Sequence, residues 1–374
     1  MAITFVIHGM GKHSPGWWTG EQGIQSKVSK LKRFDSLRDG ANDLSGLVEE
    51  IDWVELNYDS FSEKIRQAPE QDGNFDSLIT AISSSENSSV SDTELTQWKE
   101  NSVEFTNALN PFNRTDFLKD NVWDVFLCTN KLTRHYLALQ IADQILAVLQ
   151  ERGATSPWSI LAHSLGTALI QDVLNILYSE LGQQDIIRAP RVVCLIANFS
   201  RTKIGNILVS QNPASEETSV WPSKVIGQSM CRYYISARHK LDPLSYLGDE
   251  MPDPWHSKPE GFLPGCYRVL EHKDLNFVPA SLNPSDPVAV GSHNHSLENY
   301  LAHPIIHLPF FYRALGKGSR ITAKVEKDAT TEFLKTREPT TVNFAKVIAG
   351  NDLSSVKSWV EALAKVGKDY GVIS

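Results

Sequence analysis

The stretch WSILAHSLGTALI, residues 158–170, joins an apolar run to an apolar helical pattern across a segment of small and polar residues. The run at 158–162 predicts a buried β-strand, and the pattern at 167–178, rich in Leu, Ile and Val, predicts a helix. A buried strand followed at once by such a helix is the repeating unit of a parallel sheet with crossover helices. The stretch therefore places the chain among the α/β proteins.

Ser164 lies in the turn between this strand and this helix. A serine exposed on so sharp a turn needs small residues two positions before and after it, because the strand and helix backbones approach closely there. Ala162 and Gly166 meet that need. The pattern is weak by itself, so its position between strand and helix carries the prediction that Ser164 is a nucleophile. The alternative is a serine that only caps the helix.

Similar units recur along the chain. Helical patterns at 21–32 and 132–150 lie between short apolar runs. Because these runs are continuously apolar, we expect a mostly parallel sheet of about six or more strands, covered by helices on both faces. The runs that predict strands are at 3–7, 51–58, 158–162, 192–197, 233–236 and 266–270.

Two segments do not fit this repeat. Residues 59–125 form an insertion with a Ser-rich centre at 83–89, which we interpret as a cap or lid. Residues 316–374 form a polar C-terminal extension that ends in a helical pattern at 356–366. We therefore expect an α/β core at 1–315 that contains the insertion, followed by the extension.

The composition indicates a globular protein without a nucleic-acid partner. The formal charge of the 374-residue chain is -8, whereas nucleic-acid binders normally carry a basic surface. No apolar run is long enough for a membrane span, and residues 1–7 are too short for the apolar part of a signal peptide. We expect a cytoplasmic protein without an integral membrane segment, and export that needs no cleaved signal stays open.

The cysteines are scattered, and most of them stand in or beside apolar runs, where a free cysteine behaves as a small buried hydrophobe. They are Cys128, Cys194, Cys231 and Cys266. We expect neither a disulfide framework nor a zinc site from them.

The sequence HGMG, residues 8–11, follows the first predicted strand. Glycines let the chain curve so that a backbone N–H points into a site, where it stabilises the negative charge of a tetrahedral intermediate. We expect the backbone N–H groups of Met10 and Leu165 to form such an oxyanion hole. A plain connecting turn is the alternative. A phosphate-binding loop does not fit, because Lys12 is followed by His13 rather than by Ser or Thr.

With this turn after the first strand and the Ser164 turn after the third, the sequence resembles the α/β-hydrolase superfamily, in its lipase and esterase branch, over about residues 1–312. The resemblance implies an α/β-hydrolase fold. It also implies a catalytic acid just after a strand downstream of the nucleophile, and a histidine after the last strand. It does not account for the insertion or the extension.

Two downstream residues match these implied positions. Asp242 follows the strand predicted at 233–236, and Pro243 ends that strand in a rigid turn that would fix the carboxylate. Asp249 is the nearest competitor, and an aspartate that serves only its own turn is the alternative. His295 follows the last strand and precedes a predicted helix. The resemblance thus implies that His295 is the general base and that Asp242 orients it.

Other histidines compete with His295. His293 is the main alternative base. His293 and His295, together with Asp242 or His239, could also begin a metal site. A metal site would make the serine turn and the glycine turn coincidences, so we expect no metal and no cofactor. The histidines expected on the surface or in packing contacts are His293, His303 and His307.

The expected reaction is hydrolysis of a carboxylic ester through an acyl-serine intermediate. Met10, the pair Trp17-Trp18 and the insertion suggest a hydrophobic acyl group, so the expected substrate is a small-molecule or lipid ester. A thioesterase, an amidase or an acyltransferase would use the same residues. A non-catalytic binding protein of the same fold is the alternative from another class.

Overall fold

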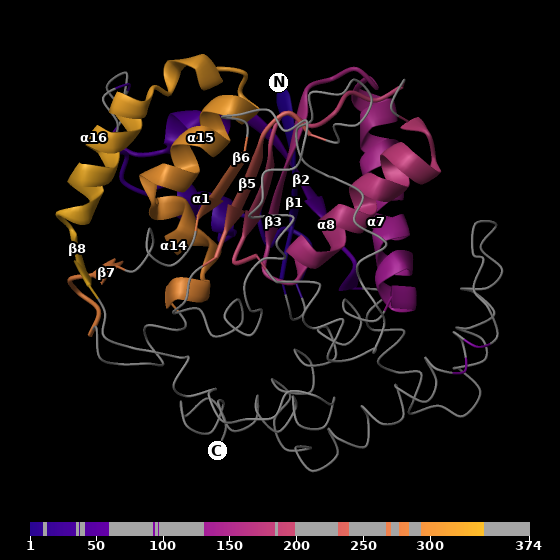
Figure 1. Ribbon diagram of the computed structural model, residues 1–374, viewed down its shortest axis with the longest axis horizontal. Coiled ribbons are helices and arrows are strands. Elements are labelled where there is room, and N and C mark those ends of the chain that lie inside the picture. Colours follow the sequence, from indigo (N-terminus) through magenta and orange to yellow (C-terminus); the bar gives the residue numbers. More distant parts are fainter. Residues whose placement is uncertain are drawn as a thin grey trace, which may run out of the picture.

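In the computed structural model, the described residues form a parallel six-stranded sheet between two layers of helices (Figure 1). These residues are 1–9, 13–34, 37, 42–59, 93, 96, 131–183, 186–198, 231–238, 267–270, 277–283 and 293–339. The strands are β1 (Ala2–Ile7), β2 (Ile51–Leu56), β3 (Trp158–His163), β4 (Val193–Ile196), β5 (Tyr234–Ala237) and β6 (Tyr267–Leu270). All neighbouring strands are parallel, so the predicted α/β class is confirmed.

The order of the strands across the sheet, β2-β1-β3-β4-β5-β6, determines where a site can form. The connection from β1 to β2 runs toward one edge, whereas the chain then crosses back over β1 and adds all later strands on the other side. The winding therefore reverses between β1 and β3. In open parallel sheets a crevice forms at such a reversal, outside the carboxyl ends of the two strands. Gly9 and Ser164 stand just beyond those ends.

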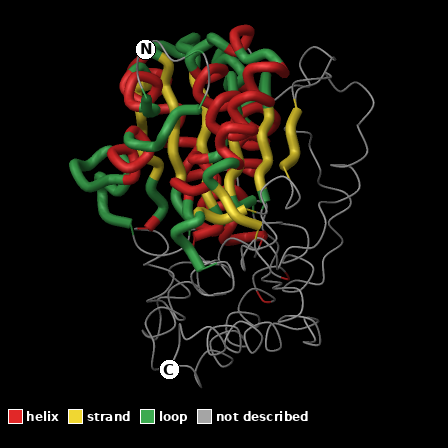
Figure 2. Tube along the Cα trace, turned by 90° about the vertical axis from the view of Figure 1, so that its left-hand side faces the viewer, coloured by secondary structure: helices red, strands yellow, loops and turns green. Residues whose placement is uncertain are grey.

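Helices cover each face of the sheet. On one face α7 (Lys131–Arg152) packs on α8 (Gly166–Asn175), and they contact β2 and β3 respectively (Figure 1). Figure 2 shows the strands side by side between the helices. The helices of the other face contact one another, and one of them contacts β5; they include α1 (Ile24–Ser29), α2 (Ser45–Glu49), α14 (Leu297–Ala302) and α15 (Pro304–Ala314).

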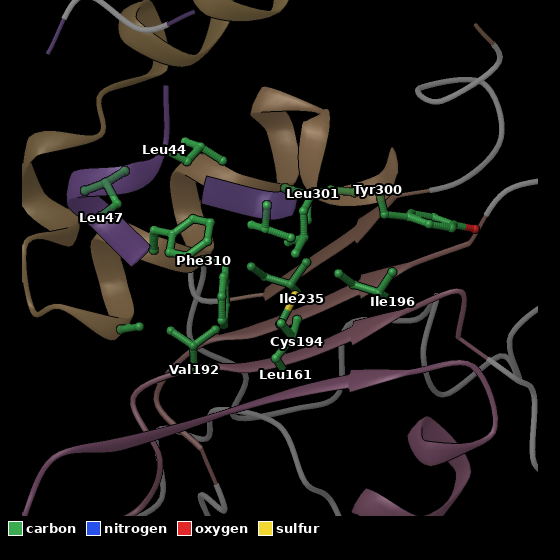
Figure 3. Packing of buried hydrophobic residues seen from close by; sticks show 14 of the residues in the cluster. Leu44, Leu47, Leu161, Val192, Cys194, Ile196, Ile235, Tyr300, Leu301 and Phe310 are labelled. Atoms are coloured by element: carbon green, nitrogen blue, oxygen red, sulfur yellow. The ribbon is translucent and has the colours of Figure 1, made fainter. Parts of the chain in front are cut away.

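The centre of the sheet is continuously apolar. Leu161, Cys194 and Ile235 are register partners on β3, β4 and β5, and all three are buried. They belong to a cluster with Leu301 of α14 and Phe310 of α15 (Figure 3). Cys194 is a free thiol, and burial raises its pKa well above the usual range, so it stays protonated as a small hydrophobe. This packing holds α14, and the loop before it, against the sheet.

Two predicted helices have different ends. The helix expected at 21–32 is only α1, because the chain then turns so that Lys32 forms an isolated β-bridge with Asp43. The helix expected at 167–178 is α8 followed by a π-helical turn, η3 (Ile176–Glu180). In both places apolar residues continue the helical pattern while the backbone changes its hydrogen bonding.

The strand expected at 51–58 ends at Leu56. The side chain of Gln144 on α7 accepts from the N–H of Asn57 (3.1 Å) and donates to its carbonyl (2.9 Å), so these groups do not continue the ladder. The Asn57 side chain also accepts from the N–H of Asp59 (2.7 Å). The chain therefore turns directly after β2.

The first part of the C-terminal extension is structured. α16 (Ala323–Leu334) begins at Thr322, whose hydroxyl accepts a hydrogen bond from the first turn, and it packs on α15. Its residue Phe333 lies edge-on to Phe34, with ring centroids 5.4 Å apart. The sequence gives little sign of α16, because only two of its side chains are buried.

The remaining described elements are an antiparallel ribbon of β7 (Phe277–Pro279) and β8 (Arg337–Pro339) and a short 3-10 helix, η6 (Gly318–Arg320). Among the described helices, none is long and apolar enough to cross a membrane. Nearly all of the insertion at 59–125, and the helix expected at 356–366, lie outside the described residues. The cap and the domain boundaries therefore stay predictions.

Candidate active site

Ser164 occupies a strained turn between β3 and α8. Its φ is 53°, in the left-handed region that favours glycine. Its N–H donates to the carbonyl of Ile196 on β4 (2.9 Å), and its carbonyl accepts from the N–H and hydroxyl of Thr167 (2.9 and 2.5 Å). Such strain costs on the order of 1–3 kcal/mol and persists where surrounding contacts enforce it, most often at functional sites. The sharp turn expected at Ser164 is present.

The hydroxyl of Ser164 has no hydrogen-bond partner within the described part of the chain, although the residue is only 1% exposed. α8 receives no side-chain cap from the described residues. The interpretation of Ser164 as a capping serine is therefore wrong. A buried hydroxyl without a partner costs about 1–3 kcal/mol, so stability does not explain this side chain.

The expected exposure of Ser164 is also wrong. The chain that leaves β1 covers it, since a Cβ placed on Gly9 would lie 2.6 Å from the Cβ of Ser164 and 3.1 Å from its Oγ. So close an approach of backbone to side chain leaves room only for glycine. We call residues 8–9, which follow β1, the β1 exit. The β1 exit is packed directly on the candidate nucleophile.

Gly166 stands at a second backbone contact. A Cβ there would lie 2.4 Å from the carbonyl oxygen of His8 and 3.1 Å from two side-chain carbons of Ile7. The small residue expected two positions after the serine is thus required by the neighbouring strand β1, and not only by the turn between β3 and α8.

Gly166→Ala should lower the free energy of unfolding by about 1–3 kcal/mol, because the added methyl group meets backbone that cannot move aside. Gly46→Ala is the matched control, since Gly46 lies within α2 and nothing stands within 4 Å of its added Cβ. Alanine favours a helix over glycine by about 1 kcal/mol, so this variant should be at least as stable as the wild type. Urea unfolding measures both, and equal stability of the two variants would contradict the contact.

The segment that carries His295 reaches the serine turn. The Nε2 atom of His163, the residue before Ser164, lies 2.7 Å from the carbonyl oxygen of His295, across 132 positions of sequence. The centroids of the two imidazole rings are 5.0 Å apart. His295 is half-buried and precedes α14. The structure therefore brings His295 beside the residue that precedes the candidate nucleophile.

His293 supports the same loop. Its carbonyl accepts from the side-chain amide of Asn299 (2.8 Å) and from the N–H of Ser296 (3.3 Å). Burial, together with the nearby cation of Arg337, lowers the pKa of His293 to about 4. An imidazole with this pKa holds a proton poorly at neutral pH, so His293 is a weak candidate for the general base.

His303 and His307 have packing roles, as expected. The Nδ1 atom of His303 accepts from the N–H of Ile305 at the start of α15 (3.3 Å). The Nδ1 atom of His307 lies 2.9 Å from the carbonyl oxygen of Leu301, and both histidines are buried. These contacts join α14 to α15 and lie within the helical layer.

A buried aromatic cluster beside the β1 exit has no counterpart in the sequence prediction. His8 lies against Tyr58 and His13, with ring centroids 4.3 and 4.1 Å apart. Its Nε2 atom is 3.5 Å from Oδ1 of Asp59, whose Oδ2 accepts from the N–H of His13 (2.7 Å). The sequence does contain one sign of this cluster, since the carboxylate of Asp59 follows β2 closely and β2 pairs with β1. The sequence interpretation instead places Asp59 at the start of the insertion.

Stability should fall as the pH drops below about 6.5, in part because of His8. Burial, and then the neighbouring His13, lowers the pKa of His8 from 6.5 to about 3. Between these values the unfolded state binds the proton and the folded state does not, so acid favours unfolding. One such histidine contributes about 2 kcal/mol between pH 7.5 and 5.

His8→Phe keeps an aromatic ring against Tyr58 and should remove this part of the pH dependence. Urea unfolding of the variant and the wild type at two pH values, one above and one below 6.5, measures the difference. An unchanged loss of stability in the variant would show that His8 titrates normally in the folded protein.

Glu55 fixes the loop that carries Trp17. Its carboxylate accepts from the hydroxyl of Thr19 (2.9 Å) and from three backbone N–H groups, those of Gly16 (2.7 Å), Trp18 (2.9 Å) and Thr19 (2.7 Å). Burial alone would raise the pKa of Glu55, but these hydrogen bonds, those of Thr19 first, outweigh it and hold the pKa below its usual range. The loop is thus attached to β2 by charge-assisted hydrogen bonds.

An open hollow of about 270 Å³ lies on this loop and is lined by residues 13–17 with Gln22 and Gly23. The ring of Trp17 is 5.6 Å from that of His8, so the hollow adjoins the β1 exit. Trp18 is instead fully buried against another tryptophan of the core. Of the two tryptophans expected at the site, only Trp17 lines this hollow.

Leu165 lies at the N-cap position of α8. Backbone N–H groups at this end of a helix have no partner within the helix, and the helix dipole is positive there. The Leu165 N–H follows Ser164 directly, which suits stabilisation of negative charge near that hydroxyl. Met10, Asp242 and Asp249 lie outside the described residues, so the second donor and the acid stay predictions.

The described part of the site therefore combines a strained serine, the positive end of α8 and a nearby histidine segment at the point where the winding reverses. Such groups can perform nucleophilic attack on a carbonyl carbon. A comparison of the chain with models of protein families, with curated proteins and with solved structures finds no match.

Proposed function

We propose that this chain is a serine hydrolase of the α/β-hydrolase fold that cleaves a carboxylic ester through an acyl-serine intermediate. The observation that carries the proposal is Ser164 at the carboxyl end of β3, whose backbone is strained and whose hydroxyl has no described hydrogen bond. Neither feature stabilises the fold, and a nucleophile accounts for both. Because the hydroxyl is buried beneath Gly9, the proposal also requires the β1 exit to move before a substrate reaches it.

In the proposed reaction the Oγ atom of Ser164 attacks the carbonyl carbon of the ester while His295 accepts its proton. The carbonyl oxygen becomes an oxyanion, which the N–H groups of Leu165 and Met10 stabilise. His295 then gives the proton to the leaving alkoxide, and the acyl group remains on the serine. Water, activated by the same imidazole, releases the acid and restores the hydroxyl. Asp242 keeps His295 in the required tautomer.

The surroundings of the β1 exit support an uncharged, partly apolar substrate, either a small-molecule or a lipid ester. The hollow at Trp17 adjoins the exit and offers an indole face. The depressed pKa of His8 keeps that imidazole neutral at physiological pH, so His8 offers no positive charge to an acidic group. An apolar part of the ester fits this hollow.

Labelling with a fluorophosphonate tests the proposal, because the reagent bonds to an activated serine. The native protein should be modified at Ser164, and the signal should disappear in Ser164→Ala. Folded protein that stays unlabelled at high reagent concentration, or a variant that labels as well as the wild type, would overturn the assignment. A series of p-nitrophenyl esters of increasing chain length, beside thioester and phospholipid substrates, then identifies the acyl and leaving groups.

A further inference from the structure

Three arginines gather at the amino ends of the strands. Arg188 and Arg191 lie just before β4, and Arg232 lies just before β5. The N–H of Arg191 donates to the carbonyl of Trp158 (2.7 Å), and the N–H of Arg232 donates to the carbonyl of Pro190 (2.9 Å). Neighbouring strands lie about 4.8 Å apart, so these side chains start from adjacent positions on a fixed backbone.

The backbone of Arg188 is also fixed by hydrogen bonds. Its carbonyl accepts from the indole N–H of Trp158 (2.5 Å) and from the hydroxyl of Tyr178 (2.9 Å). Arg188 and Arg232 are exposed, whereas Arg191 is half-buried. The guanidinium groups of Arg188 and Arg232 are therefore open to solvent, while the backbone beneath them is rigid.

No acidic side chain forms an ion pair with these arginines within the described ranges, where the ion pairs belong to other cations. Within the described part of the chain, the guanidinium groups form one hydrogen bond, from Nη1 of Arg191 to the carbonyl of Ala314 at the end of α15 (3.0 Å). Burial, and then the proximity of Arg232 and Arg188, lowers the pKa of Arg191. Three positive charges thus repel one another, and no carboxylate of the described residues pairs with them.

We propose that Arg188, Arg191 and Arg232 form a binding site for a phosphate group carried by a soluble molecule. Planar guanidinium groups bind phosphate oxygens through paired N–H donors, and three of them at one place match a compact, multivalent oxyanion. A nucleic acid or an anionic membrane is held by a broader basic surface. The net charge of -8 leaves the chain without an excess of basic residues for one.

This arginine site lies at the amino ends of the strands, whereas the serine turn lies at their carboxyl ends. Ser164 follows the carboxyl end of β3, whereas the arginines precede β4 and β5. A strand of six residues such as β3 spans about 20 Å. Phosphate binding here therefore does not depend on catalysis at Ser164, and each can fail without the other.

Calorimetric titration of the full chain with sodium pyrophosphate at low ionic strength tests the site. Arg232→Gln and Arg188→Gln should each weaken binding about tenfold or more, since each removes a charge-assisted contact. Arg152→Gln is the matched control. Arg152 is the last residue of α7, also near the amino ends of the strands, and it is exposed, but it pairs with Asp52. The control should bind pyrophosphate like the wild type.

Thermal melting without pyrophosphate shows whether the variants fold. Arg232→Gln should melt at or above the temperature of the wild type, because it relieves repulsion around Arg191. Absence of pyrophosphate binding, or equal affinity in the wild type and both variants, would overturn the site. A rise of melting temperature with phosphate that is equal in all variants is a general salt effect and counts against it as well.

Discussion

Ser164→Ala should reduce kcat/KM for ester hydrolysis by about 10⁴–10⁶-fold while the protein remains as stable as the wild type or becomes more stable. Activity is lost because the attacking oxygen is removed. Stability is kept because that oxygen has no described hydrogen-bond partner, and removal of a buried, unsatisfied hydroxyl relieves about 1–3 kcal/mol. Steady-state kinetics and urea unfolding on one preparation give both values.

Ser159→Ala is the matched control for this experiment. Ser159 also belongs to β3, is fully buried (0% exposed) and has a hydroxyl without a partner among the described residues. The free energy of unfolding of Ser159→Ala should be equal to or higher than that of the wild type, and its turnover should be unchanged. Retained turnover in the Ser164 variant would remove Ser164 from the reaction. A clear loss of stability there would instead show that its hydroxyl has a structural contact.

His295→Ala should lower kcat by about 10³-fold or more, whereas His293→Ala should leave it within a few-fold of the wild type. The carbonyl of His295 already lies against His163, beside the serine. His293 has a pKa of about 4, since burial and the nearby Arg337 disfavour its protonated form. An imidazole with so low a pKa is too weak a base to remove the serine proton efficiently at neutral pH.

Steady-state kinetics of both variants at one neutral pH measure the difference between the two histidines. A larger loss of kcat in His293→Ala than in His295→Ala would make His293 the base and would require the loop before α14 to rearrange.

The serine turn was predictable because its determinants lie in one short stretch. The apolar run of β3, the small residue Gly166 and the helical pattern of α8 are all local. The parallel sheet followed from the same reasoning, since a strand covered on both faces requires continuous apolar residues. Even the approach of His295 was implied by its order along the chain in the resemblance to α/β-hydrolases.

The burial of Ser164 was not predictable, because it arises from contact with Gly9, a residue far away in the sequence. The same holds for the contacts of Glu55 on β2 and Asp59 just after it. Their carboxylates bind the chain that follows β1, which is also far away in the sequence. Periodicity records which face of an element is apolar, but it does not record which distant backbone lies against it. The helix α16 was not predictable for a different reason, since its apolar face is too narrow to produce a clear periodic pattern.

The contact of Gly9 with Ser164 has a kinetic consequence. Among the described residues, the backbone at Gly9 lies directly on Ser164, so in the proposed reaction it has to move before an ester reaches the hydroxyl. The next residue along that backbone, Met10, is the second proposed oxyanion donor. Entry of the substrate and completion of the catalytic centre then become a single induced-fit step. Esters with a longer apolar chain, which have more binding energy to displace this backbone, should therefore react faster than short-chain esters of equal chemical reactivity.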